Sequence, residues 1–448
     1  MFKNKIFRIL LILVSVYVVV FYYKVLPELW GNPLRVTKNN SVLDNDIPYD
    51  VIDAYYQSNY GSCQHSVVRE NKINCKKLIK NETMMTQIIP VNESRICNLT
   101  KITENCQLFR HINGYDDKVI TKLEEDFPLA FGIRLHNSPE QIEQILRIIY
   151  RPHNFYCIHV DTGSDIHIFN SLKAVARCFE NVVVLSKIRT LYSSIRLVEA
   201  DLLCMKEALK SSIQWKYFLN MAGEEVPLKT NLEIVQICQL LQGRNDIESE
   251  PATPFAIARI KWEFNVTEFQ IIKTNVLKKP FTGNFLLRKG CAYGTFARKF
   301  VQFVFKNDKA NDLFEFLKDT YAPEEAFFNT LNTVDGAPGG YNITIKHFNR
   351  DFLSRTVLWS WGEPINCPGE FRRAVCVFNN KALPWLVKQP EMIVNKMDGN
   401  YDQVVIDCME EYLRNRTLQA DVTGFNKTRY LQYPHIKDLR NKNLWEKI

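Results

Sequence analysis

Strands and helices alternate between residues 128 and 241, and this alternation restricts the chain to one class of fold. Apolar runs predict strands at 128–136, 155–160, 182–185 and 217–221, and helical spacing predicts helices from 138, over 194–209 and over 231–241. Such an order is typical of a parallel sheet with helices on both faces. We therefore expect an α/β fold with a doubly wound, mixed or parallel sheet flanked by helices.

The first predicted helix has a clear start signal. Ser138 is expected to cap it, because Pro139 suits the first helical position and Gln141 can complete a capping box. Ile142 and Ile145 then begin an apolar stripe at helical spacing. This stripe predicts that the helix packs on the sheet.

Polar side chains follow three of the predicted strands. In doubly wound sheets ligands bind beyond the carboxyl ends of the strands. His136, Asp161 and the pair Glu224 and Glu225 lie at three such ends. Asp161 suits hydrogen bonding to a nucleotide base or ribose, and the alternative is that it caps its own loop.

Two further groups of charged residues are candidates for chemistry. Glu324 and Glu325 open an apolar, helix-like segment, where a carboxylate either caps the helix or serves as a general base that deprotonates a hydroxyl. Arg372, Arg373 and Lys396 could neutralise an anionic leaving group, although each one alone is typical of a solvated surface charge.

Residues 9–23 form the only long uninterrupted apolar run, with Lys3, Lys5 and Arg8 before it and Lys24 after it. The run is shorter than the ~20 residues of a typical span, but tilt and snorkelling cations can close the gap. A cleaved signal peptide is the alternative, but no small-residue cleavage site follows the run. We interpret it as a signal-anchor with its basic end in the cytosol.

Cysteines and glycosylation signals support a lumenal location for the rest of the chain. All 12 cysteines follow the apolar run, and the absence of zinc-like Cys or His spacing favours disulfides over structural zinc. The Asn-x-Ser/Thr signals lie at Asn39, Asn81, Asn92, Asn98, Asn265, Asn342, Asn415 and Asn426.

The predicted organisation is a cytoplasmic tail over 1–8, a transmembrane signal-anchor over 9–23, a lumenal stem over 24–120 and a catalytic domain over 121–448. The net charge of +8 is spread along the chain, so no nucleic-acid partner is expected. An acidic small molecule fits this charge better. The oligomeric state, a homodimer included, stays open at this point.

Seven segments, taken in order, resemble the β-1,6-N-acetylglucosaminyltransferases, the core 2 and I-branching enzymes of glycosyltransferase family 14. The likeness covers roughly residues 120–440. The segments are 154–161, 192–206, 229–235, 289–293, 322–325, 373–378 and 395–398. The resemblance implies a GT-A-like catalytic domain in a single-pass type II protein of the Golgi membrane. It also implies metal-independent, inverting transfer of GlcNAc from UDP-GlcNAc to the 6-hydroxyl of Galβ1-3GalNAc on Ser/Thr, forming a β-1,6 branch.

The resemblance also implies a role for each candidate site residue. Glu325 falls on the catalytic base, and Arg373 and Lys396 fall on the basic pair that holds the donor diphosphate in place of a metal. The other matches are Asp161 and Tyr192 on the donor side, and Glu248, Arg259, Trp359 and Trp361, the last replacing a family Tyr, on the acceptor side. The implied disulfides are Cys75–Cys408, Cys106–Cys178, Cys157–Cys204 and Cys367–Cys376. The only Asp-x-Asp triplet, the usual metal motif of sugar-nucleotide enzymes, lies at 44–46 in the predicted stem, so we expect no metal and no other cofactor.

Three departures from the family pattern bear on substrate choice. Ala256 replaces an acceptor-side Lys of some core 2 enzymes, the family's Gly-x-Asp-Phe-Pro turn reads 223–227 as Gly-Glu-Glu-Val-Pro, and the segment 359–367 is shortened. A peptide O-xylosyltransferase or a glucosyltransferase of the same superfamily is therefore the main alternative. A non-catalytic lumenal glycan-binding homologue is a second one, but it would be free to lose Glu325, Arg373 or Lys396, and all three are present.

Overall fold

The computed structural model describes residues 71–85, 87–90, 98–116, 120–283, 286–340, 352–361, 366–419, 425–433 and 436–437. These residues belong to one compact unit within 53–448. The predicted tail and anchor therefore lie outside the described residues, as do Asn39, Asn92, Asn342, Cys63 and Cys97. In the described ranges no helix combines the length and apolar character needed to cross a membrane.

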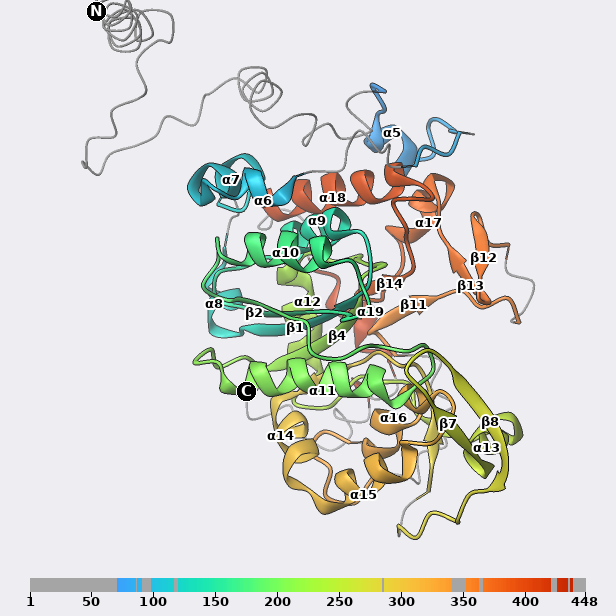
Figure 1. The fold of residues 1–448 in the computed structure, drawn as a ribbon. Helices are drawn as coiled ribbons and strands as arrows, with labels where there is room; N and C mark the ends of the chain where they lie inside the picture. The colour runs from blue at the N-terminus through green and yellow to red at the C-terminus, as the bar shows by residue number, and fades with distance from the viewer. Residues whose placement is uncertain are drawn as a thin grey trace, which may run out of the picture. The chain divides into compact units, whose positions relative to one another are not determined.

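A five-stranded sheet forms the centre of the described unit (Figure 1). Its strand order is β10-β4-β1-β2-β3, with bounds β1 Leu129–Leu135, β2 Phe155–Val160, β3 Val182–Leu185, β4 Tyr217–Ala222 and β10 Thr295–Ala297. The four predicted strands pair in parallel, and every residue of β1 and β2 is buried, as expected for strands covered on both faces. The edge strand β10 runs antiparallel to β4, so the sheet is mixed.

Helices cover both faces of this sheet. The α9 (Pro139–Ile149) and α10 (Ile166–Ala176) helices lie on one side and α11 (Ile195–Lys210) on the other (Figure 1). The α12 helix (Asn231–Leu241) follows β4 and the short strand β5, at the predicted bounds. The doubly wound α/β arrangement predicted from the alternation is thus present.

The predicted capping of α9 by Ser138 is wrong in its detail. Ser138 adopts a left-handed backbone conformation with φ 52° and makes no side-chain capping bond. Its hydroxyl instead accepts a hydrogen bond from Asn400. Gln141 donates to the carbonyl oxygens of Gly223 and Met397, so a long-range contact has replaced the local capping box.

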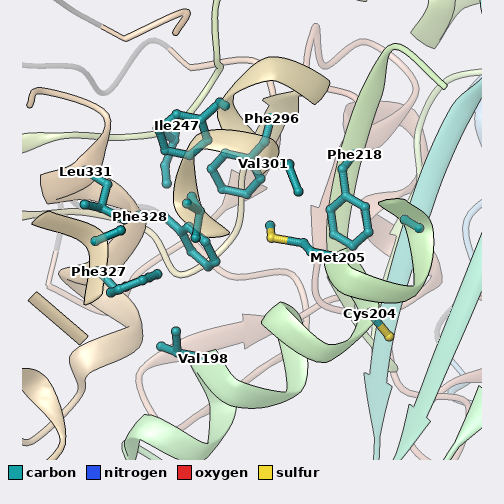
Figure 2. Packing of buried hydrophobic residues seen from close by; sticks show 14 of the residues in the cluster. Val198, Cys204, Met205, Phe218, Ile247, Phe296, Val301, Phe327, Phe328 and Leu331 are labelled. Atoms are coloured by element: carbon teal, nitrogen blue, oxygen red, sulfur yellow. The ribbon is translucent and has the colours of Figure 1, made fainter. Parts of the chain in front are cut away.

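One apolar cluster fixes the segment that carries Glu325. Side chains from α11, β4, β10, α14 (Arg298–Lys306), α15 (Asp308–Leu317) and α16 (Phe327–Leu331) meet in it. Phe296 of β10 packs on Phe328 of α16 with ring centroids 4.9 Å apart (Figure 2). Phe327 and Phe328 of α16 are both buried, and their burial anchors α16 and the 3-10 turn η3 (Pro323–Glu325) that precedes it.

A second sheet, of order β11-β14-β5, lies beyond the end of β4. Its strands are β5 (Glu225–Pro227), β11 (Arg355–Val357) and β14 (Ile393–Asn395), and the β12–β13 hairpin (Glu370–Arg372 and Val375–Val377) adjoins it. The remaining elements are α5 (Cys75–Ile79), α6 (Leu99–Ile102), α7 (Cys106–Ile112), α8 (Lys122–Asp126), β6 (Glu250–Pro251), α13 (Pro254–Lys261), β7 (Trp262–Val266), β8 (Ile271–Leu277), β9 (Arg288–Lys289), η4 (Asn380–Ala382), α17 (Leu383–Leu386), α18 (Gln403–Leu418) and α19 (Lys427–Tyr430).

Four disulfides join distant parts of the unit, and they are the four pairs that the resemblance implies. Cys75–Cys408 connects α5 with α18, and Cys106–Cys178 connects α7 with the segment after α10. Both therefore tie helices of the predicted stem to the body. The other two pairs are Cys157–Cys204, between β2 and α11, and Cys367–Cys376. Within the described ranges Cys238 and Cys291 form no disulfide.

Candidate active site

Glu325 presents a positioned carboxylate at the end of η3. The backbone around it is held from two sides, because the Ala322 N–H donates to the Ser193 carbonyl at 2.8 Å and the Gly290 N–H donates to the Glu325 carbonyl at 2.9 Å. Its Oε2 accepts a hydrogen bond from Arg259 Nη1 at 2.7 Å, and its side chain is 28% exposed. The carboxylate is thus oriented and reachable by a substrate hydroxyl, as a general base requires.

Glu324, its neighbour in sequence, is buried. Its Oε2 has no hydrogen-bond partner among the described residues. Burial raises the pKa of Glu324 to about 8, and the Glu325 carboxylate adds to this while Arg134 and Arg259 oppose it. The two adjacent carboxyls therefore differ in environment, and the buried one holds its proton near neutral pH.

This burial predicts a pH-dependent stability. The ordinary pKa of a Glu, near 4.5, lies below the folded value of about 8. Between these pH values the folded protein keeps a proton that the unfolded chain loses, so stability falls as pH rises through about 8. Glu324→Gln has no carboxyl to titrate at this position, so it lacks this loss of stability at higher pH. We expect its melting temperature relative to the parent to increase between pH 5 and pH 8, by roughly 3–4 °C for up to about 3 kcal/mol in a unit of this size.

Differential scanning fluorimetry of the full-length chain measures this shift. Glu315→Gln is the matched control, because Glu315 is an exposed carboxylate that pairs with Lys318 at 2.7 Å. The control and the parent should show the same pH dependence. Parallel curves for Glu324→Gln and the parent would show that Glu324 is already ionised at neutral pH.

The donor-side residues Tyr192 and Arg373 lie in contact. The Arg373 guanidinium carbon lies 4.6 Å from the centroid of the Tyr192 ring, a cation–π geometry. Arg373 and Ala374 form the two-residue turn of the β12–β13 hairpin with φ values of 50° and 67°, the signs that a type I′ turn requires. Burial and the Tyr321 hydroxyl raise the pKa of Tyr192. The Ser193 carbonyl, next in the chain, accepts the Ala322 N–H at 2.8 Å, which joins this segment to the turn that carries Glu325.

Lys396, the second predicted diphosphate ligand, follows β14. Its Nζ lies 2.7 Å from Glu224 Oε2. Arg372 has two closer partners, because its guanidinium pairs with Asp398 at 2.5 Å and with Glu370 at 2.8 Å, while Glu224 lies 3.9 Å away. Among the described residues, Arg372 thus forms ion pairs with carboxylates, whereas Arg373 forms none.

Asp161 stabilises the loop beyond β2 by accepting hydrogen bonds. Its Oδ1 accepts hydrogen bonds from the N–H groups of Gly163 and Thr190, and its Oδ2 accepts one from the Thr190 hydroxyl at 2.7 Å. The loop-capping alternative is therefore present in the structure. The same bonds hold the segment that leads to Tyr192, two residues after Thr190. A nucleotide contact of Asp161 stays a prediction.

Two of the acceptor-side residues, Arg259 and Glu248, belong to segments that contact the predicted base or its backbone. Arg259 of α13 bonds Glu325 directly. Burial raises the pKa of Glu248 to about 7; Lys289 opposes this, and Glu250 and Glu325 add to it. A Cβ at position 290 would lie 2.1 Å from the Glu248 carbonyl oxygen, so only glycine lets the chain pass this closely.

Two tryptophans adjoin the hairpin that carries Arg373. The rings of Trp359 and Trp361 stack with centroids 4.7 Å apart, and Trp359 bridges to Val375 of β13. Trp361 is 68% exposed. An exposed aromatic face of this kind suits the apolar face of a sugar ring. Their part in acceptor binding stays a prediction.

Across the described ranges, no group of three or more His, Cys, Asp or Glu side chains is arranged to hold a metal ion. The triplet at 44–46 lies outside those ranges. Metal-independent chemistry therefore stays a prediction.

Residues 129–387 match the family model of the Core-2/I-Branching enzymes. The chain belongs to this family. Similar curated proteins carry the name beta-1,3-galactosyl-O-glycosyl-glycoprotein beta-1,6-N-acetylglucosaminyltransferase 3. The mouse protein is 33% identical over 78% of this chain and 84% of its own length. The human protein is 36% identical over 71% and 75%, and the cattle protein 34% identical over 76% and 79%. The family suggested by the seven segments is thereby confirmed.

In this Core-2/I-branching enzyme a buried polar network lies at the carboxyl ends of β1 and β4, and the sequence analysis did not identify it. Arg134 Nε lies 2.6 Å from Asp201 Oδ1, and Asn220 donates to Asp201 Oδ2 at 2.9 Å. The guanidiniums of Arg134 and Arg355 each lie over the Tyr293 ring, at 5.4 and 5.5 Å. Burial raises the pKa of Tyr293 above its ordinary value. The network places buried charge and polar groups at this end of the sheet, where low dielectric strengthens their interactions.

Two charged residues of this network could have been recognised from the sequence, because each interrupts an apolar pattern. Asp201 stands on the apolar stripe of α11, between Val198 and Met205 at helical spacing, and Arg134 interrupts the apolar run of β1. A charge on a buried stripe implies a buried partner. The identity of that partner depends on the sheet topology.

All described glycosylation signals lie at the surface. Their asparagines are exposed, and they are Asn81, Asn98, Asn265, Asn415 and Asn426. Asn98 and Asn426 also cap short helices through their side-chain oxygens. Which of these sites carry glycans stays a prediction.

Proposed function

We propose that this chain transfers GlcNAc from UDP-GlcNAc to the 6-hydroxyl of Galβ1-3GalNAc on Ser or Thr, forming a β-1,6 branch. The observation that carries the proposal is the Glu325 carboxylate. It is held by Arg259 at 2.7 Å, and its turn is joined by the Ala322 N–H to the carbonyl of Ser193, the residue after Tyr192, whose ring contacts Arg373. The predicted base is thus bonded to a predicted acceptor residue, and its turn is linked through the backbone to the segment of a predicted donor residue.

The proposed reaction is a direct displacement that inverts the anomeric centre. The 6-hydroxyl oxygen forms a bond to C1 of the sugar while the bond from C1 to the UDP oxygen breaks. Glu325 accepts the hydroxyl proton, and UDP leaves as an anion. Arg373 and Lys396 stabilise the negative charge that develops on the diphosphate, in place of a metal ion. Asp161 and Tyr192 bind the nucleotide, and Glu248, Trp359 and Trp361 orient the acceptor.

The names of the relatives support the donor and the linkage. The proteins from mouse, human and cattle are named as β-1,6-N-acetylglucosaminyltransferases that act on β-1,3-galactosyl-O-glycosyl-glycoproteins. We propose the same activity here, in a GT-A-like domain on the lumenal side of a type II Golgi membrane protein anchored by residues 9–23. A peptide O-xylosyltransferase and a glucosyltransferase are the alternatives to be tested.

A donor-by-acceptor panel tests this proposal. The full-length chain in detergent is incubated with UDP-GlcNAc, UDP-Glc or UDP-Xyl and with Galβ1-3GalNAc-peptide, GalNAc-peptide or unglycosylated peptide. We expect transfer only from UDP-GlcNAc to the disaccharide peptide, with a 6-linked GalNAc in the product by linkage analysis. Transfer of xylose to unglycosylated peptide, or of glucose to any acceptor in preference to GlcNAc, would contradict the proposed donor.

A further inference from the structure

Lys396 is already paired with a carboxylate of its own chain. Its Nζ lies 2.7 Å from Glu224 Oε2, and the two side chains are 15% and 24% exposed. Partial burial strengthens such a pair relative to one on an open surface. The cation assigned to the donor diphosphate therefore has a resident anionic partner.

The backbone sets this contact. Strands β5 and β14 pair antiparallel, with Glu225 opposite Asn395, so Glu224 and Lys396 occupy the next pair of positions beyond the ladder. The Met397 N–H donates to the Glu224 carbonyl at 2.8 Å and holds the two chain segments together at this position. Directly opposed side chains on paired strands interact. The contact is therefore built into the sheet.

The surrounding charges do not supply Glu224 with an equivalent second partner. Arg372 Nη1 is 3.9 Å from Glu224 Oε1, but the same nitrogen lies 2.5 Å from Asp398. Its other terminal nitrogen lies 2.8 Å from Glu370. Lys396 is thus the close cationic partner of Glu224. A diphosphate that binds Lys396 must compete with this carboxylate and then lie beside it.

We propose that Glu224 is a resident counter-anion of the diphosphate site, which releases Lys396 when UDP or a UDP-sugar binds and re-forms the ion pair when UDP leaves. This inference rests on the proposed function, in which Lys396 holds the diphosphate. Glu224 thereby weakens the binding of donor and product alike, and favours release of UDP after transfer.

Calorimetric binding of uridine and UDP to the full-length chain tests the inference. Glu224→Gln should bind UDP about 3- to 10-fold more tightly than the parent, because an amide competes poorly for a cation and does not repel phosphate. Uridine, which has no phosphate, should bind equally to both. Glu370→Gln removes the same charge from the partner of Arg372 and should change UDP affinity less than about twofold.

The outcomes separate this inference from the function on which it rests. Unchanged or weaker UDP binding by Glu224→Gln would overturn it, since Glu224 would then only position Lys396. If Glu224→Gln does not fold, Glu224→Asp withdraws the carboxylate from Lys396 and should also tighten UDP binding. Lys396→Ala should weaken UDP binding and leave uridine unaffected. Unchanged UDP binding by Lys396→Ala would instead refute the assignment of Lys396 to the diphosphate.

Discussion

Glu325→Gln is expected to lower the turnover number by roughly 10²- to 10⁴-fold, the contribution of a positioned general base. Glutamine has almost the same shape, and its amide oxygen can still accept the hydrogen bond that Arg259 donates at 2.7 Å. It cannot take a proton from the acceptor hydroxyl at neutral pH. The chemical step therefore loses its proton acceptor while the geometry of η3 and α13 is kept.

Glu325→Gln should keep its affinity for UDP while its transfer rate falls. Because Glu325 does not belong to the donor-side group, UDP affinity measured by calorimetry should stay within about twofold of the parent. The rate is measured by transfer of radiolabelled sugar to the disaccharide peptide. Glu315→Gln, which changes an exposed carboxylate on α15, is the control and should keep full activity. Transfer at the parental rate by Glu325→Gln would remove Glu325 as the base.

The central strands and helices could be predicted because their signals are local. The apolar runs of β1 and β2 and the periodic stripe of α9 each lie within a dozen residues. The antiparallel strand β10 carries no such signal, since Thr295–Ala297 is a three-residue segment that pairs with β4 through topology alone. Ser138 shows the same limit, because a distant partner, Asn400, overrides its local capping preference.

The candidate site was predictable residue by residue only through the resemblance. Sequence spacing allowed two roles for Asp161, a loop cap or a nucleotide contact. Its observed hydrogen bonds are those of a loop cap. The pair of Glu224 and Lys396 could not be foreseen, because it depends on the pairing of β5 with β14. Glu225 and Asn395 of that pairing are 170 residues apart in sequence. Contacts of this kind follow from the assembled fold.

Lys396→Ala and Arg373→Ala are each expected to lower kcat/KM for the donor by roughly 10²- to 10³-fold, the usual loss when one preorganised charge partner of a developing anion is removed. Arg372→Ala is the matched control, because the adjacent arginine already pairs with Asp398 and Glu370. Arg372→Ala should lower kcat/KM for the donor much less than Arg373→Ala does. Equal losses from both arginines would mean that the hairpin as a whole, rather than Arg373, supports the donor.

The same two cations predict how the enzyme responds to chelation. If Arg373 and Lys396 neutralise the leaving diphosphate, the parent should keep its full rate in excess EDTA, and added Mn²⁺ should give no large gain. The variants provide the sharper comparison, because a divalent cation can bridge phosphate oxygens and could restore part of the rate lost in Lys396→Ala. Rescue of the variant by Mn²⁺, with no effect on the parent, would identify the missing charge as the cause of the loss. Strict dependence of the parent on Mn²⁺ would refute the metal-independent scheme, while the Glu325→Gln result would still decide the identity of the base.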